Sequence, residues 1–202
     1  MQHKRVLIYG DSNVWGQGDY FSGEGRMDES AQWPLILGGL LGPDWVVIQE
    51  GLPGRFAGNF EEVESHRNGK GDIFTATLIS ALPIDLLIVA LGGNDLNNSY
   101  QRTAQQIYDD LIWYCNKLWL NSKDTPALYV APADFKVSEY FDEDSYARRS
   151  ELMDLLSSGN VCGMEVLDPG KLPVHNDGIH YTKEGHQQLA ALVHQWMEAN
   201  IL

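Results

Sequence analysis

Cysteine is scarce in this sequence, and no long hydrophobic run occurs in it. The two cysteines, Cys115 and Cys162, are too few for a disulfide framework and fit neither a CxxC pair nor the Cys/His spacing of a zinc site. We expect both to be ordinary core residues. No stretch reaches the roughly 18 apolar residues of a membrane span, so the sequence predicts no transmembrane helix.

Positive charge is also scarce. The chain of 202 residues has 14 Lys and Arg residues against 28 Asp and Glu residues, and its formal net charge is −14 at pH 7. Such a charge repels phosphate backbones and anionic lipid surfaces, so we expect neither nucleic acid nor membrane as a partner. Because the apolar stretch 6–9 is too short for a secretory signal, we expect a soluble, cytoplasmic protein.

Short apolar runs alternate with helical patterns along the chain. The runs predict buried strands at Val6–Tyr9, Trp45–Gln49, Leu86–Leu91, Leu128–Ala131 and Glu165–Leu167. Helices are predicted at Trp33–Leu41, Ile73–Ala81, Gln101–Leu120, Tyr146–Leu156 and behind the cap residue Thr182. This alternation predicts an α/β fold in one domain, with a parallel sheet covered by helices on both faces.

Two of the predicted helices carry an apolar stripe that should face the core. The first stripe comprises Ala104, Ile107, Tyr108, Leu111, Cys115, Leu118 and Trp119, and the second comprises Leu189, Leu192, Val193, Trp196 and Met197. His186 lies on the second stripe, which favours a packed residue over a catalytic one. The remaining isolated histidines, His3, His66 and His194, are expected to be solvated.

A serine follows the first predicted strand, in the sequence Gly10-Asp11-Ser12-Asn13. Ligands of open parallel sheets bind beyond the carboxyl ends of the strands, so the hydroxyl of Ser12 is placed where a nucleophile belongs. The alternative is that Asp11 and Ser12 only cap the following turn.

Hydrogen-bond donors follow the next two strands. Gly54 lies in the loop after the second strand, and Gly92-Gly93-Asn94-Asp95 follows the third. Each loop alone could be a simple turn. A glycine N–H and an asparagine amide that converge on the crevice of a serine would instead stabilise the oxyanion of an acyl-transfer reaction.

An acid and a histidine, Asp177 and His180, precede the last helix. A short turn brings a carboxylate and an imidazole at this spacing together, which orients the ring and leaves Nε2 free to act as a base. Two alternatives are a helix-capping Asp beside a surface His, and a metal site formed with His175. No further ligand cluster completes such a metal site, so we expect no metal.

Other catalytic and nucleotide-binding motifs are incomplete. The residues after Ser12 do not form the Gly-x-Ser-x-Gly elbow of the larger α/β hydrolases. The glycines 16–18 lack the third glycine of a dinucleotide fingerprint, and 68–71 lacks the Walker Ser/Thr. We therefore expect no nucleotide and no other cofactor.

Taken in order, four of these blocks resemble the SGNH (GDSL-type) hydrolase superfamily. They are Gly10-Asp11-Ser12, Gly54, Gly92-Gly93-Asn94-Asp95 and Asp177-Gly178-Ile179-His180. The resemblance spans almost the whole chain and implies one domain over 1–202. It also implies a three-layer α/β/α, flavodoxin-like fold with a five-stranded parallel sheet of order 2-1-3-4-5. Asn13 stands where the family name has leucine, a change that we expect to touch no catalytic atom.

The resemblance also implies roles for individual residues. Ser12 would be the nucleophile, His180 the general base and then acid, and Asp177 its orienting partner. The oxyanion would be held by the backbone N–H groups of Ser12 and Gly54 and by the side-chain amide of Asn94. Asp95 is expected to be structural and to hold the turn of Asn94.

The implied activity is hydrolysis of short-chain or aryl carboxylic esters, with acyl transfer to alcohols as a further option. Residues 15–16, the stretch 47–52 that leads to Gly54-Arg55, and residues 68–69 look like the bacterial arylesterase and acyltransferase branch. A carbohydrate O-acetylesterase stays an alternative, followed by a lysophospholipase or thioesterase and by a non-catalytic binding domain. The expected partner is a small-molecule ester.

The sequence leaves the substrate pocket and the assembly open. The aromatic residues Trp15, Tyr20, Phe21 and Phe56 lie near the catalytic blocks in sequence and could form an apolar pocket or simply pack the loops. The Gly-rich stretch predicts a surface loop, and the wider loop Gly16–Ser30 could be a lid or a contact in a homo-oligomer.

Overall fold

The computed structural model describes residues 3–138, 140–158 and 163–202. A five-stranded parallel sheet has the order β2-β1-β3-β4-β5. Its strands are β1 (Lys4–Gly10), β2 (Trp45–Gly51), β3 (Leu86–Ala90), β4 (Ala127–Val130) and β5 (Glu165–Leu167). The predicted fold class, strand order and strand positions are confirmed, with ends that differ by a few residues.

The two central strands are apolar at nearly every position because helices cover both faces of the sheet. In β1, Leu7 and Tyr9 point into one hydrophobic cluster while Val6 and Ile8 point into the other. This alternation follows from the two-residue period of a strand. A run without polar residues therefore predicts a strand that is buried on both faces.

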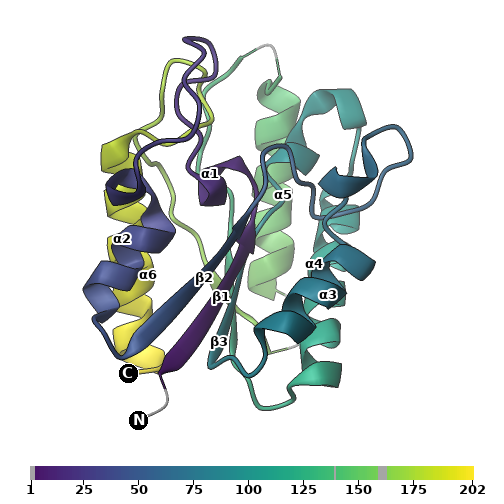
Figure 1. Ribbon diagram of the computed structural model, residues 1–202. Helices are drawn as coiled ribbons and strands as arrows, with labels where there is room; N and C mark the ends of the chain where they lie inside the picture. Colours follow the sequence, from purple (N-terminus) through teal and green to yellow (C-terminus); the bar gives the residue numbers. More distant parts are fainter. Residues whose placement is uncertain (1–2, 139, 159–162) are drawn as a thin grey trace.

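The helices form two layers (Figure 1). On one face α2 (Trp33–Leu41) packs against α6 (Lys183–Asn200), and on the other lie α3 (Asp72–Ala81), α4 (Ala104–Asn121) and α5 (Glu143–Ser158). One-turn helices occupy the connecting loops. They are α1 (Ser12–Trp15), η1 (Glu29–Ala31), η2 (Ser65–Arg67), η3 (Asn94–Leu96) and η4 (Asn98–Tyr100).

Two long helices begin at threonine caps. Thr182 accepts a hydrogen bond from the N–H of Gly185, which confirms it as the cap of α6. Thr103 and Gln106 form a reciprocal capping box at the start of α4. The helix predicted from Gln101 therefore starts later, and Gln101 itself has a left-handed backbone with φ 48°.

Both apolar stripes face the core, with one exception each. Trp119 is 53% exposed and Leu192 is 36% exposed, so the prediction was wrong for these two side chains. Each lies at the edge of its stripe, where the 100° step per residue turns a side chain toward solvent. Cys115 is buried as predicted, whereas Cys162 lies outside the described residues.

None of the helices in the described ranges is long and apolar enough to span a membrane.

Candidate active site

The first strand ends against a short helix that presents a serine. Asp11 caps α1 through a hydrogen bond of 2.9 Å from the N–H of Asn13 to its Oδ1. The capping alternative therefore holds for Asp11, but Ser12 follows the cap as the first residue of the helix. A side chain at Gly10 would come within 2.2 Å of Val14 and 2.6 Å of the carbonyl of Ala90. The tight turn after β1 therefore requires glycine there.

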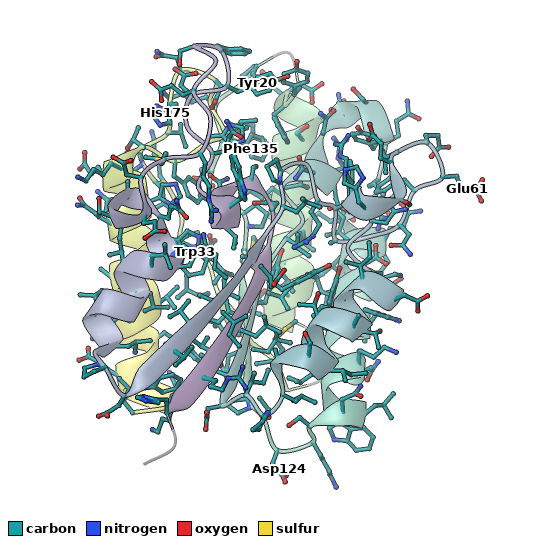
Figure 2. The ribbon with its side chains drawn as sticks, in the orientation of Figure 1. Tyr20, Trp33, Glu61, Asp124, Phe135 and His175 are labelled. Atoms are coloured by element: carbon teal, nitrogen blue, oxygen red, sulfur yellow. The ribbon has the colours of Figure 1, made fainter. Side chains whose placement is uncertain are left out.

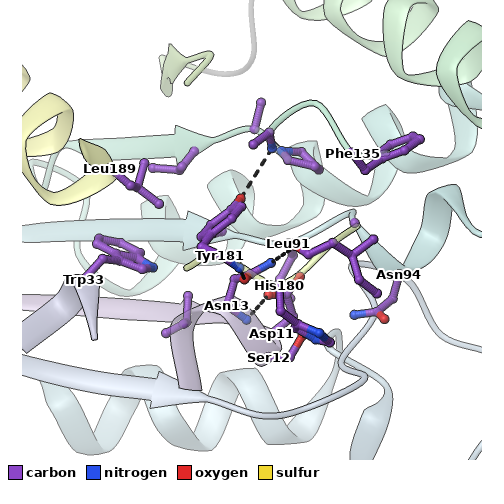
Figure 3. A pocket seen from close by; sticks show the side chains of 18 of the residues that line it. Asp11, Ser12, Asn13, Trp33, Leu91, Asn94, Phe135, His180, Tyr181 and Leu189 are labelled. Atoms are coloured by element: carbon purple, nitrogen blue, oxygen red, sulfur yellow. Dashed lines mark hydrogen bonds between the residues drawn. The ribbon is translucent and has the colours of Figure 1, made fainter. Parts of the chain in front are cut away.

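Three side chains, from Ser12, His180 and Asp177, form a continuous hydrogen-bonded chain, and Figure 3 shows the first two of them. Nε2 of His180 lies 3.0 Å from Oγ of Ser12, and Nδ1 of His180 lies 2.8 Å from Oδ2 of Asp177. All three residues are buried. The structure thus brings together a serine from the end of β1 and an Asp-x-x-His turn that precedes α6, 168 residues further along the chain.

Asp177 is stabilised as a carboxylate. Burial by itself raises its pKa, but four hydrogen bonds outweigh that effect and hold the pKa well below the usual range. Besides the ring of His180, the donors are the backbone N–H groups of His180, Ile179 and Tyr20. The carboxylate therefore stays charged at neutral pH and can hold the imidazole in one tautomer.

Asn13 attaches the histidine turn to α1. Its Nδ2 donates to the carbonyl of Ile179 at 3.2 Å, and its Oδ1 accepts from the N–H of Tyr181 at 3.0 Å. These contacts lie on either side of His180 and touch no atom of the serine, histidine or aspartate side chains. Sequence reasoning treated Asn13 as a neutral departure from leucine, but only an amide makes both contacts. Its position directly after the serine was the available signal.

Asn94, in η3, points its amide toward the same place. It lines the cavity that Ser12 and His180 also line, and its Nδ2 donates to the carbonyl of Arg55 at 2.9 Å. One hydrogen of the amide is thereby oriented and the other stays available. Gly54 directly precedes Arg55 and has a left-handed backbone with φ 73°; in the described chain its N–H has no protein acceptor. Gly54 is not among the described residues that line the cavity.

Asp95 holds a neighbouring loop, and not the turn of Asn94 as predicted. Its buried carboxylate accepts the N–H groups of Ala57 at 2.7 Å and Gly58 at 3.2 Å. Burial raises the pKa of Asp95 to about 6, against the opposing effect of these hydrogen bonds and of Arg102. The expected structural role is real, but its target is the loop that contains Gly54.

Arg55 is a buried cation that sequence reasoning missed. Its Nη1 donates to the carbonyls of Gly10 at 2.9 Å and Glu50 at 2.6 Å, and its guanidinium lies 4.1 Å from the ring centroid of Tyr9. Its backbone carbonyl orients Asn94. Arg55 therefore connects the end of β1, the end of β2 and the loop after β3. The contacts with Gly10 and Asn94 span 45 and 39 residues, so no local pattern revealed them.

Asp11 is a second buried carboxyl beside the serine. Burial raises its pKa to about 6, opposed by the hydrogen bond from Asn13 and by the positive charge of His180 and Arg55. It lines the same cavity as Ser12. The acidic group next to Ser12 therefore keeps its proton to a higher pH than an exposed aspartate does.

The cavity at Ser12 is narrow and mostly apolar, with a volume of about 60 Å³. Its apolar wall includes Leu91, Pro132, Phe135, Phe141 and Ile179. The four aromatic residues for which the sequence left a pocket or a loop-packing role open do not line it. Phe56 is fully buried against Phe60 and Tyr100, and Tyr20 and Phe21 are exposed. Proximity in sequence to the catalytic blocks was therefore a poor guide to the pocket.

The remaining histidines stand apart from the serine. His186 is fully buried and its Nδ1 accepts the N–H of Trp33, as expected of a packed residue. His3 and His66 are exposed as predicted, whereas His194 is partly covered and lies 3.7 Å from Glu198. Among the residues that the structure describes, no cluster of three or more His, Cys, Asp or Glu side chains is arranged to hold a metal ion.

Solved structures with the same architecture include three esterases by their names. The native aryl esterase of M. smegmatis matches with a TM-score of 0.86 at 24% identity, over 97% of this chain and 99% of that chain. Est24, a carbohydrate acetylesterase from Sinorhizobium meliloti, matches with a TM-score of 0.87 at 24% identity over the same shares. A putative arylesterase from Agrobacterium tumefaciens matches with a TM-score of 0.81 at 23% identity, again over 97% and 99%.

No protein-family model and no curated protein sequence matches the chain. At this level of identity the structural likenesses show the fold. The chain has the three-layer α/β/α fold of the SGNH hydrolases, with the sheet order that the four sequence blocks implied.

Proposed function

We propose that the protein is a serine esterase that hydrolyses short-chain or aryl carboxylic esters through an acyl-enzyme on Ser12. The observation that carries the proposal is the hydrogen-bonded chain from Ser12 through His180 to Asp177, with steps of 3.0 and 2.8 Å. A structural role needs no such chain, because a buried serine is satisfied by one backbone carbonyl. Nucleophilic catalysis needs a base on the serine and an acid to orient that base.

The reaction has two halves. Oγ of Ser12 forms a bond to the ester carbonyl carbon while its proton moves to Nε2 of His180. The tetrahedral intermediate then breaks its bond to the alcohol oxygen, which takes the proton from His180 and leaves. Water attacks the acyl-enzyme in the second half, again with His180 as base and then acid. Another alcohol in place of water would give acyl transfer.

The oxyanion of each intermediate would be held by Asn94 and by the backbone N–H groups of Ser12 and Gly54. The support is that Asn94 lines the cavity with one amide hydrogen engaged by Arg55, and that the N–H of Gly54 has no acceptor in the described chain. Preorganised donors of this kind need no rearrangement as charge develops.

The substrate class follows from the cavity. Its small volume and apolar wall suit a short acyl group and disfavour the long chains of a lysophospholipase or an acyl thioesterase. The second candidate function is deacetylation of carbohydrates, because the structural likeness to a protein named as a carbohydrate acetylesterase is as strong as that to the aryl esterase. Both functions use the same serine and the same small acyl group.

The decisive test compares Ser12→Ala with Ser150→Ala, an exposed serine on α5. We expect Ser12→Ala to lose hydrolysis of p-nitrophenyl acetate and covalent labelling by a fluorophosphonate, and Ser150→Ala to keep both. Retained turnover in the Ser12 variant would refute the proposal. Acetate release from acetylated xylan, measured beside aryl acetates, separates the two substrate classes.

A further inference from the structure

The carboxylate of Asp177 receives one hydrogen bond from far away in the sequence. Three of its four donors belong to its own turn, at residues 179 and 180. The fourth is the backbone N–H of Tyr20, which donates to Oδ2 at 2.9 Å across 157 residues. Oδ2 is also the oxygen that faces Nδ1 of His180. A surface loop thus completes the environment of the aspartate.

This loop, residues 17–26, is called the rim loop below. Its tip is built on the buried Asp19, whose Oδ1 accepts the N–H of Phe21 at 3.0 Å and whose carbonyl accepts the N–H of Glu24 at 3.1 Å. Tyr20 follows Asp19 directly in the chain, and its N–H faces Asp177. Figure 2 shows Tyr20 at the end of the molecule to which the strands point.

The base of the rim loop is attached to the helix that carries the serine. Nε of Arg26 donates to the carbonyl of Trp15 at 2.8 Å, and its guanidinium lies 5.4 Å from the centroid of the Trp15 ring. Its Nη2 donates to the side chains of Gln32 and Gln49 at 3.1 and 3.2 Å. Trp15 ends α1, which begins at Ser12. The loop therefore follows the helix that begins at Ser12, contacts Asp177 through Tyr20 and returns to the same helix at Arg26.

We propose that the N–H of Tyr20 is a positioning group for catalysis: it fixes Oδ2 of Asp177 and thereby sets how strongly His180 binds the serine proton. The proposal rests on the proposed esterase function. The side chain of Tyr20 takes no part in it, because that side chain is 61% exposed and only its N–H contacts the aspartate.

The physical reason is the sharing of one oxygen. A carboxylate oxygen that accepts a second hydrogen bond carries less negative charge toward the imidazole, and its direction is fixed. Without the second donor, the carboxylate stabilises the imidazolium more strongly, and backbone N–H groups hold it only at Oδ1. The base then protonates at a higher pH, and fewer molecules have the ring aligned with Ser12.

The test compares Tyr20→Pro, which removes the N–H, with Tyr20→Ala, which keeps it. We expect Tyr20→Ala to stay within about twofold of the parent kcat/KM. Tyr20→Pro should lose about tenfold, mainly in kcat, which matches a lost hydrogen bond to a charged group. The acidic limb of its pH profile should also move to higher pH. A Tyr20→Pro protein with the parent rate and profile, or a Tyr20→Ala protein as impaired as Tyr20→Pro, would overturn the proposal.

A spectroscopic measurement separates this proposal from the proposed function. The downfield proton resonance of His180 Nδ1–H reports its contact with Asp177 whether or not esters are hydrolysed. We expect this resonance to shift in Tyr20→Pro and to stay in place in Tyr20→Ala; an unchanged resonance in Tyr20→Pro refutes the positioning role. The esterase function itself is tested separately, by the Ser12→Ala variant.

A second variant covers the case in which Tyr20→Pro does not fold. Arg26→Ala removes the attachment of the rim loop to Trp15, Gln32 and Gln49 while leaving every atom of the serine, histidine and aspartate in place. We expect the same direction of change in the resonance and in the acidic limb, at a smaller size. An Arg26→Ala protein with the parent resonance and profile counts against the proposal.

Discussion

The proposed catalytic centre is supported from two sides that are built differently. On one side lies the loop of residues 52–58, called the oxyanion loop here, and on the other the rim loop. The oxyanion loop is buried from Arg55 to Gly58, whereas residues 20–26 of the rim loop are all exposed. Each loop nevertheless contacts a residue that the proposed reaction uses. The oxyanion loop contacts Asn94, and the rim loop contacts Asp177.

The difference lies in what holds each loop. The oxyanion loop is held by a buried carboxylate and a buried guanidinium, from Asp95 and Arg55, and by close backbone packing. The rim loop is held by a few polar contacts at its base and tip. A side chain added at Gly25 would meet nothing within 4 Å, whereas one at Gly69 would lie 2.1 Å from the carbonyl of Phe56. A small side chain should therefore be tolerated at Gly25 of the rim loop and not at Gly69 beside the oxyanion loop.

The largest expected effect is on the rate of the reaction and comes from Asn94, which the oxyanion loop orients. Asn94→Ala should lower kcat by about 10²- to 10³-fold with little change in KM, because an oxyanion donor acts mainly in the transition state. Steady-state kinetics with p-nitrophenyl acetate measure both constants. A parent-like kcat would remove Asn94 from the proposed oxyanion hole.

The next effect is on stability, in a matched pair of buried aspartates. Asp95→Ala leaves the N–H groups of Ala57 and Gly58 buried without their acceptor and should lower the free energy of unfolding by about 3 kcal/mol. Asp19→Ala releases only the local contact at the rim-loop tip and should cost about 1 kcal/mol. Urea unfolding of both variants gives the comparison, and equal losses would contradict the contrast between the two loops.

A glycine pair tests the same contrast through packing. Gly69→Ala forces a Cβ against the backbone of the oxyanion loop and should cost about 2 kcal/mol, as other overpacked sites do. Gly25→Ala, in the rim loop, should stay within about 0.5 kcal/mol of the parent. Thermal unfolding of the two proteins measures the difference, and a stable Gly69→Ala protein would show that the oxyanion loop can shift.

The last expected effect is pH-dependent and lies at His186 in α6, whose Nδ1 accepts the N–H of Trp33 at the start of α2. Burial, with smaller effects from His175 and His180, lowers the pKa of His186 from 6.5 to about 4. Between pH 6.5 and about pH 4 the unfolded chain therefore binds a proton at His186 and the folded protein does not. The stability that this residue contributes is present above pH 6.5 and is lost as the pH falls toward 4.

The variant His186→Gln removes that term while keeping an acceptor for the N–H of Trp33. Between pH 7.5 and pH 5 the parent should lose about 2 kcal/mol more stability than the variant. Denaturant unfolding at the two pH values checks it. Parallel losses in both proteins would mean that His186 binds its proton while folded.

Much of the fold was accessible from the sequence because its signals are local. Apolar runs such as Val6–Tyr9 lie in strands buried on both faces, and Thr182 caps a helix where the pattern placed one. Ser12, Asp177 and His180 stood out because strand ends and short turns place their side chains predictably. The pocket wall was less accessible from the sequence, since Phe56 packs against Phe60 and Tyr100 and does not line the cavity.

The sequence by itself determined the class of the fold, the order of its elements and the residues that carry the proposed chemistry. These depend on periodicity and on short motifs, which act within a few residues. Only the tertiary structure decided what surrounds those residues. Asn13 bonds to the backbone next to His180, the carbonyl of Arg55 orients Asn94, and the N–H of Tyr20 donates to Asp177. Such contacts join segments through closed loops of many residues, so they arise only when the whole sheet and its helices have assembled.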